Sequence, residues 1–152
     1  MILTNDGSFT RNATILNNSK IDIQLCQQNQ IYFHNQQIHT LNVSYNIERS
    51  VWLIQQKEKI VFATSQYLSS KNKENATLNK KQAIGSSLII NENNIHRDLT
   101  KIFLGYCQEL EKYFNSIGPL WGRSYNIYID VETTLIIHEI FSSRLPKVLI
   151  NY

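Results

Sequence analysis

The stretch from residue 118 to residue 141 contains two apolar segments, which we predict to be the arms of a β-hairpin. Residues 124–129 and 135–141 are rich in β-branched and aromatic side chains, as strands usually are. A short polar segment at 130–132 separates them and is suited to a turn. The two arms are therefore expected to lie side by side in an antiparallel sheet.

A second hairpin is predicted at 51–55 and 60–64, because the charged triplet at 57–59 separates two apolar runs. Further upstream, apolar and polar residues alternate over 21–25, which is the period of a strand. The polar stretches at 27–30 and 35–37 are predicted to be turns that flank a short strand at 31–33.

Helices are predicted at two places. Asp6 or Ser8 is a suitable cap for a short helix that runs towards Leu16. Between residues 99 and 114, apolar side chains recur every three or four positions, which is typical of a helix. Gly105 interrupts that pattern, so a strand to about residue 106 followed by a short helix stays open as an alternative. The polar residues 71–81 are predicted to form a surface loop.

Composition and length place these elements in one domain that spans residues 1–152. Many strand candidates joined by short connections, with few helices, predict the α+β class built on one antiparallel sheet. The net charge is +3, and the Lys and Arg residues are scattered, which argues against nucleic-acid binding. No apolar run reaches the ~18 residues of a membrane span, and the first residues lack the regions of a signal peptide, so a secreted protein is not expected.

The residues that could carry chemistry are few. The four histidines lack the spacing of a zinc site, so no metal is expected. Cys26 and Cys107 are far apart in the sequence, which suggests a reducing compartment, and Cys107 lies in an apolar pattern typical of a buried, inert thiol. No nucleophile or phosphate-binding motif is present.

Isolated charges within apolar segments are the strongest chemical signal in the chain. Arg49, Arg97, Arg123 and Glu139 all lie in such segments, where a charge is costly to bury unless it is paired or used. Arginine offers a rigid fork of donors that suits a carboxylate, so the set indicates a site for a small acidic ligand. The alternative is that Arg123 and Glu139 form a structural ion pair or point to solvent.

Several sequence blocks, taken together and in order, resemble the chorismate lyase (chorismate–pyruvate lyase) family, including its small relatives encoded in plastid genomes. Each block is short, and the specificity lies in their order along most of the chain. The blocks are residues 6–11 (DGSFTR), 48–65 (beginning Glu-Arg), 83–85 (AIG), 96–98 (HRD), 120–123 (LWGR) and 135–141 (LIIHEIF).

This resemblance implies a strongly curved antiparallel sheet with helices, and with flap-like segments that close over a buried ligand site. It implies an enzyme that removes pyruvate from chorismate to give 4-hydroxybenzoate, without a cofactor, for quinone biosynthesis. Chorismate and 4-hydroxybenzoate are then the expected small-molecule partners. If the protein is plastid-encoded, it is expected to act in the chloroplast stroma, and if it is not, in the cytoplasm. A monomer is the favoured oligomeric state.

The resemblance also assigns roles to individual residues. Arg49 corresponds to the carboxylate-binding arginine of the family, and Glu139 corresponds to the glutamate that meets the ring hydroxyl, so both are the candidate catalytic residues. The candidate substrate-binding residues are Phe9, Ile84, Gly85, Arg97 and Arg123. From the residues alone, Gly85 could equally serve only a turn.

Two other functions were weighed against the lyase. A non-catalytic binding domain for a small aromatic carboxylate would share every pocket residue, so fold-level likeness does not separate it from the enzyme. A basic protein that contacts acidic partners would need clustered positive charge, and the sequence scatters its Lys and Arg.

Overall fold

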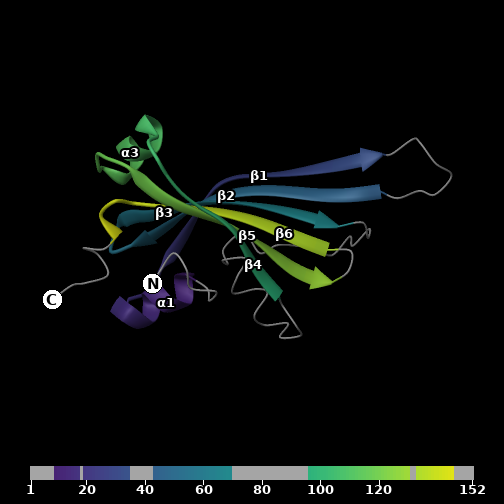
Figure 1. Cartoon of the computed structure of the whole chain (residues 1–152), viewed down its shortest axis with the longest axis horizontal. Helices are drawn as coiled ribbons and strands as arrows, with labels where there is room; N and C mark the ends of the chain where they lie inside the picture. Colours follow the sequence, from purple (N-terminus) through teal and green to yellow (C-terminus); the bar gives the residue numbers. More distant parts are fainter. Residues whose placement is uncertain (1–8, 18, 35–42, 70–95, 131–132, 146–152) are drawn as a thin grey trace.

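A single antiparallel sheet of six strands forms the body of the protein, which confirms the predicted α+β class (Figure 1). The computed structural model describes residues 9–17, 19–34, 43–69, 96–130 and 133–145. The strands lie in the order β1-β2-β3-β6-β5-β4, so β1 and β4 form the two edges. Their bounds are β1 (Asp22–His34), β2 (Val43–Gln55), β3 (Glu58–Ser69), β4 (His96–Gly105), β5 (Leu120–Asp130) and β6 (Thr133–Phe141), with the helices α1 (Phe9–Asn17) and α3 (Gln108–Phe114).

Both predicted hairpins are present, and both are longer than predicted. β2 pairs with β3, with Val51 opposite Ala63, and β5 pairs with β6, with Tyr125 opposite Ile137. The tight turn between β2 and β3 uses Gln56 and Lys57, which both have positive φ. Two such residues match the twist of the flanking strands, as in two-residue hairpin loops generally.

The predicted turn at 27–30 is wrong, because these residues belong to the continuous strand β1. The whole of β1 pairs with β2, with one irregularity between Leu25 and Gln27. As an edge strand, β1 can expose Gln and Asn side chains to water while its backbone groups bond to β2. The polar composition therefore marks an exposed edge and not a break in the chain. The predicted turn at 35–37 and the loop at 71–81 lie outside the described residues.

Residues 99–114 do not form one helix, and the alternative of a strand followed by a short helix is confirmed. β4 ends at Gly105, and α3 begins at Gln108. The ladder between β4 and β5 shifts between Leu99 and Lys101, so one extra residue is inserted there. A bulge of this kind places Leu99 and Ile102 on the same face, and this gave the strand a helix-like spacing of three.

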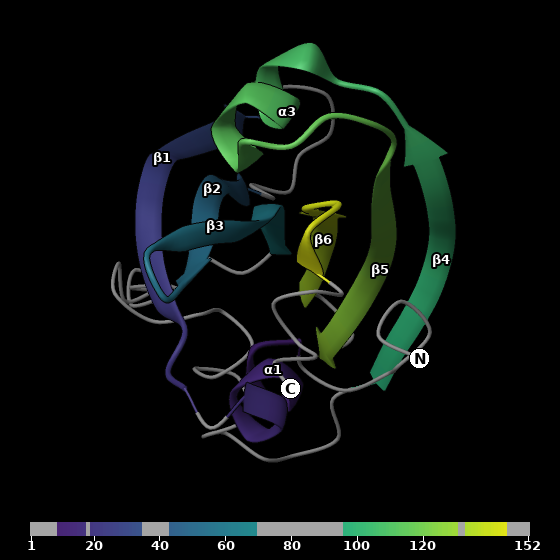
Figure 2. The same ribbon diagram turned by 90° about the vertical axis from the view of Figure 1, so that its left-hand side faces the viewer.

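The two faces of the sheet carry different helices (Figures 1 and 2). The face here called the α1 face carries two apolar clusters, one centred on Leu53, Val61 and Phe141 and the other on Ile47, Ile127, Leu135 and Ile137. Phe9 of α1, a helix that agrees with the one predicted towards Leu16, lies on Phe141 with 5.3 Å between ring centroids. On the opposite α3 face, Trp52 packs edge-on against Phe114 of α3 at 5.2 Å.

Gly122 on β5 leaves room for a neighbouring ring, and we expect Gly122→Ala to destabilise the protein. A β-carbon at this position would lie 2.2 Å from Cζ of Phe103 on β4, so the ring would have to move. Overpacking of this kind typically costs about 1–3 kcal/mol of unfolding free energy. Chemical denaturation of the purified variant would measure the loss.

Gly105→Ala is the matched control, because no atom lies within 4 Å of the β-carbon that it would add. It should leave the unfolding free energy almost unchanged. Equal losses in both variants would contradict the role given to Phe103.

Candidate functional site

Three charged side chains lie on the α1 face, where Arg123 and Glu139 form a pair and Arg49 lies two strands away from Glu139. Arg123 on β5 lies directly opposite Glu139 on β6, while Arg49 on β2 lies opposite Ser65, which itself lies opposite Ile137. Residues two apart on a strand share a face, so Arg49 and Glu139 both face the side covered by α1. Arg49, Arg123 and Glu139 are 4%, 2% and 6% exposed.

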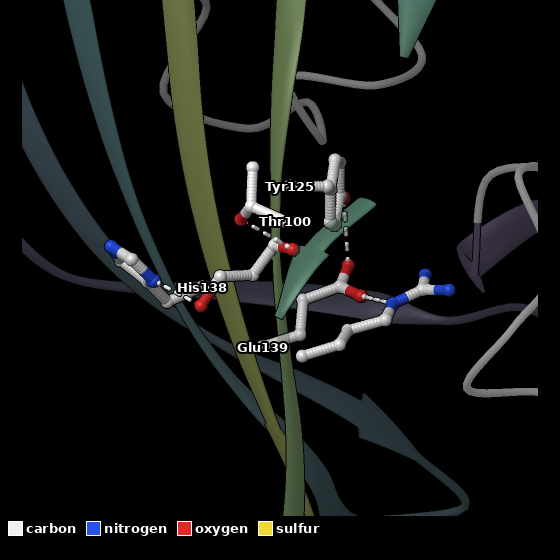
Figure 3. Close-up of polar contacts among 6 residues, drawn as sticks. Thr100, Tyr125, His138 and Glu139 are labelled. Carbon is white, nitrogen blue, oxygen red and sulfur yellow. Dashed lines mark hydrogen bonds and ion pairs between the residues drawn. The ribbon is translucent and has the colours of Figure 1, made fainter. Parts of the chain in front are cut away.

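Glu139 is held by two donors (Figure 3). Nε of Arg123 lies 2.7 Å from Oε2, and the hydroxyl of Tyr125 donates to Oε1 at 3.1 Å. Of the alternatives left open by the sequence, a buried ion pair is therefore correct and a solvent-facing orientation is wrong. A buried carboxylate with a donor on each oxygen is fixed in one orientation.

Aromatic rings surround this ion pair. The guanidinium carbon of Arg123 lies 5.2 Å from the centroid of the Tyr125 ring and 5.8 Å from that of Phe141. The guanidinium carbon of Arg97, on β4, lies 5.9 Å from the Tyr125 ring. Such contacts favour a cation over a ring face, so the rings help to hold the arginines in place.

Burial also changes the acid–base properties of the site. Loss of hydration lowers the pKa of the Arg49 guanidinium from its ordinary value. Burial raises the pKa of the Tyr125 phenol, and the negative charge of Glu139 raises it further. The phenol is therefore a proton donor at neutral pH. Two guanidinium groups and one carboxylate leave a net positive charge at the centre of this face, which suits an acidic ligand.

The remaining predicted site residues lie at different places. Phe9 is buried in the apolar cluster, where it packs against Phe141, and the Phe141 ring lies between Phe9 and Arg123. Arg97 is half-buried on the edge strand β4 and contacts the ring of Tyr125, whose hydroxyl donates to Glu139. Ile84 and Gly85 lie outside the described residues.

Tyr125 was missed by the sequence reasoning, although a signal for it was present. It lies two positions after Arg123 in a segment predicted to be a strand, so the two residues had to share a face. The contact of Tyr125 with Glu139 could not be predicted from the sequence, because it depends on the register between β5 and β6.

The opposite side of the same two strands carries a second cross-strand pair. Oγ of Ser124 and Nδ1 of His138 are 2.7 Å apart on the α3 face, directly behind the ion pair (Figure 3). His138 also lines a hollow of about 270 Å³, together with residues of β2 and β3 that include Glu48, Arg49, Thr64 and Gln66. This side has mixed donors and acceptors and lacks the apolar enclosure found around Glu139.

In the part of the chain that the structure describes, no three His, Cys, Asp or Glu side chains are grouped so that they could hold a metal ion. Both cysteines, Cys26 and Cys107, are free and exposed, so the expected burial of Cys107 is wrong: it lies in the connection between β4 and α3 and not inside a helix. Among the described helices, none has the length and apolar character needed to cross a membrane.

Fold and site together define an α+β domain with one antiparallel sheet and a charged centre buried on one face. Comparison with family models then identifies it more closely. The chain belongs to the family of Rv2949c-like chorismate pyruvate-lyases, whose model matches residues 3–149. This confirms the family resemblance noted in the sequence.

Similar proteins occur in algae under the name "uncharacterized protein ycf21". That of Porphyra purpurea is 40% identical over 148 residues, which cover 97% of this chain and 82% of the relative. That of Cyanophora paradoxa is 37% identical over 146 residues, which cover 93% and 75%.

Among solved structures, the effector domain of PhnF from Mycobacterium smegmatis has a similar fold. The TM-score is 0.64, the alignment covers 90% of this chain and 89% of that domain, and the sequence identity is 8%. At this identity the likeness shows the fold alone.

Proposed function

We propose that the protein is a chorismate–pyruvate lyase, which eliminates pyruvate from chorismate and releases 4-hydroxybenzoate. The observation that carries this proposal is the buried Glu139 carboxylate, held by Arg123 and Tyr125 on the same sheet face as Arg49. Membership of the family supports the same chemistry. Arg49 binds the ring carboxylate of the substrate, and Glu139 faces its ring hydroxyl.

The reaction requires few groups, because the substrate supplies its own driving force. The proton on the hydroxyl-bearing ring carbon leaves, and its electron pair completes the aromatic ring. The neighbouring carbon–oxygen bond breaks and gives enolpyruvate, which takes up a proton to become pyruvate. We assign the transfer of this proton to Glu139, while the arginines orient the substrate and stabilise the charge that develops on the leaving group.

Phe9, Ile84, Gly85, Arg97 and Arg123 remain the proposed substrate-binding residues. Phe9 lies close to the site through Phe141, and this supports a role for α1 in closing one end of it. A closed site excludes water and strengthens the electrostatic interactions within it.

The direct test is an assay of the purified protein with chorismate, following 4-hydroxybenzoate and pyruvate by chromatography. Equal amounts of both products, formed in proportion to enzyme and without an added metal or cofactor, are expected. The competing function is a non-catalytic binder of an aromatic carboxylate, which is favoured by the fold shared with an effector domain. Binding of 4-hydroxybenzoate without any turnover of chorismate would establish that function in place of the lyase.

Arg49→Lys should weaken the binding of 4-hydroxybenzoate about tenfold or more, because an ammonium group cannot make the two-pronged contact of a guanidinium. Isothermal titration calorimetry would measure the dissociation constant. Arg144→Lys is the control, since Arg144 is exposed and lies 3.9 Å from Glu58 on the surface. If the two variants bound equally well, Arg49 would not be the carboxylate-binding residue.

Algal relatives and the proposed product also suggest a location and a pathway class. We propose that the protein acts in the plastid stroma, where 4-hydroxybenzoate would serve as the aromatic precursor of a quinone. Immunolocalisation in algal cells would test the location, and a purely cytosolic signal would refute it.

A further inference from the structure

The hydroxyl group of Tyr125 is the second donor to Glu139, and the family resemblance gave it no role. It donates to Oε1 at 3.1 Å, while Arg123 holds Oε2 at 2.7 Å. Tyr125 is 9% exposed, and its ring lies near the guanidinium groups of Arg97 and Arg123. Its position is therefore fixed by contacts from two strands, β4 and β5.

We propose that Tyr125 is a positioning residue that holds the Glu139 carboxylate in the orientation in which it accepts a proton from the substrate. This inference rests on the proposed lyase function. A donor on each oxygen fixes the plane of the carboxylate, since neither oxygen can turn away without losing a hydrogen bond.

The lone pairs of Glu139 that the protein donors leave unoccupied determine where a proton from the substrate can bind. Each carboxylate oxygen has about two acceptor positions, and the protein donors occupy one on each oxygen. The carboxylate can still accept from a ligand on its unoccupied side. Because the Tyr125 phenol stays protonated at neutral pH, it can only donate here and cannot compete as a base.

Other charged groups in the same region act in the same direction. Arg123 contacts Glu139 directly, Arg97 faces the Tyr125 ring from β4, and Arg49 shares the α1 face from β2. All three are cations and attract a carboxylate. Tyr125 differs from them because its contribution depends on one hydroxyl group, which can be removed without changing the charge of the site.

Tyr125→Phe tests the inference, because it keeps the ring and removes only the hydroxyl. Loss of one hydrogen bond to a charged group should lower kcat about ten- to hundredfold, and KM for chorismate should change less than about threefold. A Tyr125→Phe enzyme with parental kcat, or with kcat and KM altered to the same extent, would overturn the proposal.

Tyr128→Phe is the matched control. Tyr128 lies on the same strand, and its hydroxyl accepts only an exposed contact from Asn126 at 3.3 Å in the described structure. The kcat and KM of the Tyr128→Phe enzyme should equal those of the parent. If both tyrosine variants changed equally, the effect could not be assigned to Glu139.

A measurement of stability separates this inference from the lyase proposal. Even without turnover, Tyr125→Phe should lower the unfolding free energy, because it removes the hydrogen bond to Glu139, whereas Tyr128→Phe should leave it almost unchanged. If chorismate is not converted but this difference is seen, the lyase proposal fails while the hydrogen bond to Glu139 holds. Equal unfolding free energies in the two variants would contradict the latter.

Discussion

Glu139→Gln should lower the rate of pyruvate elimination by about 10²–10⁴-fold, the usual contribution of a positioned acid–base group. Glutamine keeps the shape of the side chain and still accepts a hydrogen bond from Nε of Arg123. It has no charge with which to take a proton. We therefore expect the loss in kcat, with the affinity for 4-hydroxybenzoate retained within about tenfold. Steady-state kinetics and calorimetry would measure the two quantities.

The variant must also be shown to be folded, because the Arg123 charge loses its partner. Breaking a buried pair costs at most about 3–5 kcal/mol, and the remaining hydrogen bond should reduce this loss. Assays should be made well below the melting temperature of the variant. His138→Gln is the control, since His138 is the neighbouring residue on the opposite face and should retain full turnover. Near-parental turnover of Glu139→Gln would remove Glu139 from the mechanism.

Arg123→Met is expected to cause the largest loss of stability, about 3–5 kcal/mol at neutral pH. The guanidinium group is 2% exposed and lies 2.7 Å from Glu139, so its removal leaves a buried carboxylate without its ionic partner. Urea denaturation at neutral pH would measure the loss.

A second substitution makes the test sharper. Arg123→Met combined with Glu139→Leu should recover most of the stability, since apolar residues of similar size often replace a buried ion pair without loss. The double variant should nevertheless have no lyase activity. Recovery of stability without activity would show that the pair is kept for its chemistry. A double variant that is as unstable as Arg123→Met would show instead that the pair holds the sheet together.

The hairpins were predictable because local signals coincide there. In β5 and β6, β-branched and aromatic residues lie on both sides of a short polar turn. Isolated charges on such strands also pointed to Arg49, Arg123 and Glu139. All three prove to be buried on one face, and this depends on the registers that align β2, β3, β6 and β5 as well as on the alternation of side chains along each strand.

Other features depend on contacts between distant segments, and the sequence could not reveal them. β1 is polar over much of its length and is a strand because β2 supplies the backbone partners. The contact of Tyr125 with Glu139 depends on the register of β5 against β6, and its place two residues after Arg123 indicates only that these two side chains share a face. The binding roles of Phe9, Ile84 and Gly85 stay predictions.

The bulge in β4 determines on which face of the sheet the side chains of the first half of that strand lie. Arg97 lies opposite Ile127 and Ile102 lies opposite Arg123, so both belong to the α1 face although they are five residues apart. In an uninterrupted strand, an odd separation puts two side chains on opposite faces. The irregular position includes Thr100, whose hydroxyl donates to the carbonyl of Ser124 at 3.0 Å. Deletion of Thr100 would remove the bulge and leave Arg97 on the α1 face, whereas regular pairing of Thr100 with Tyr125 would turn Arg97 to the α3 face, away from the Tyr125 ring.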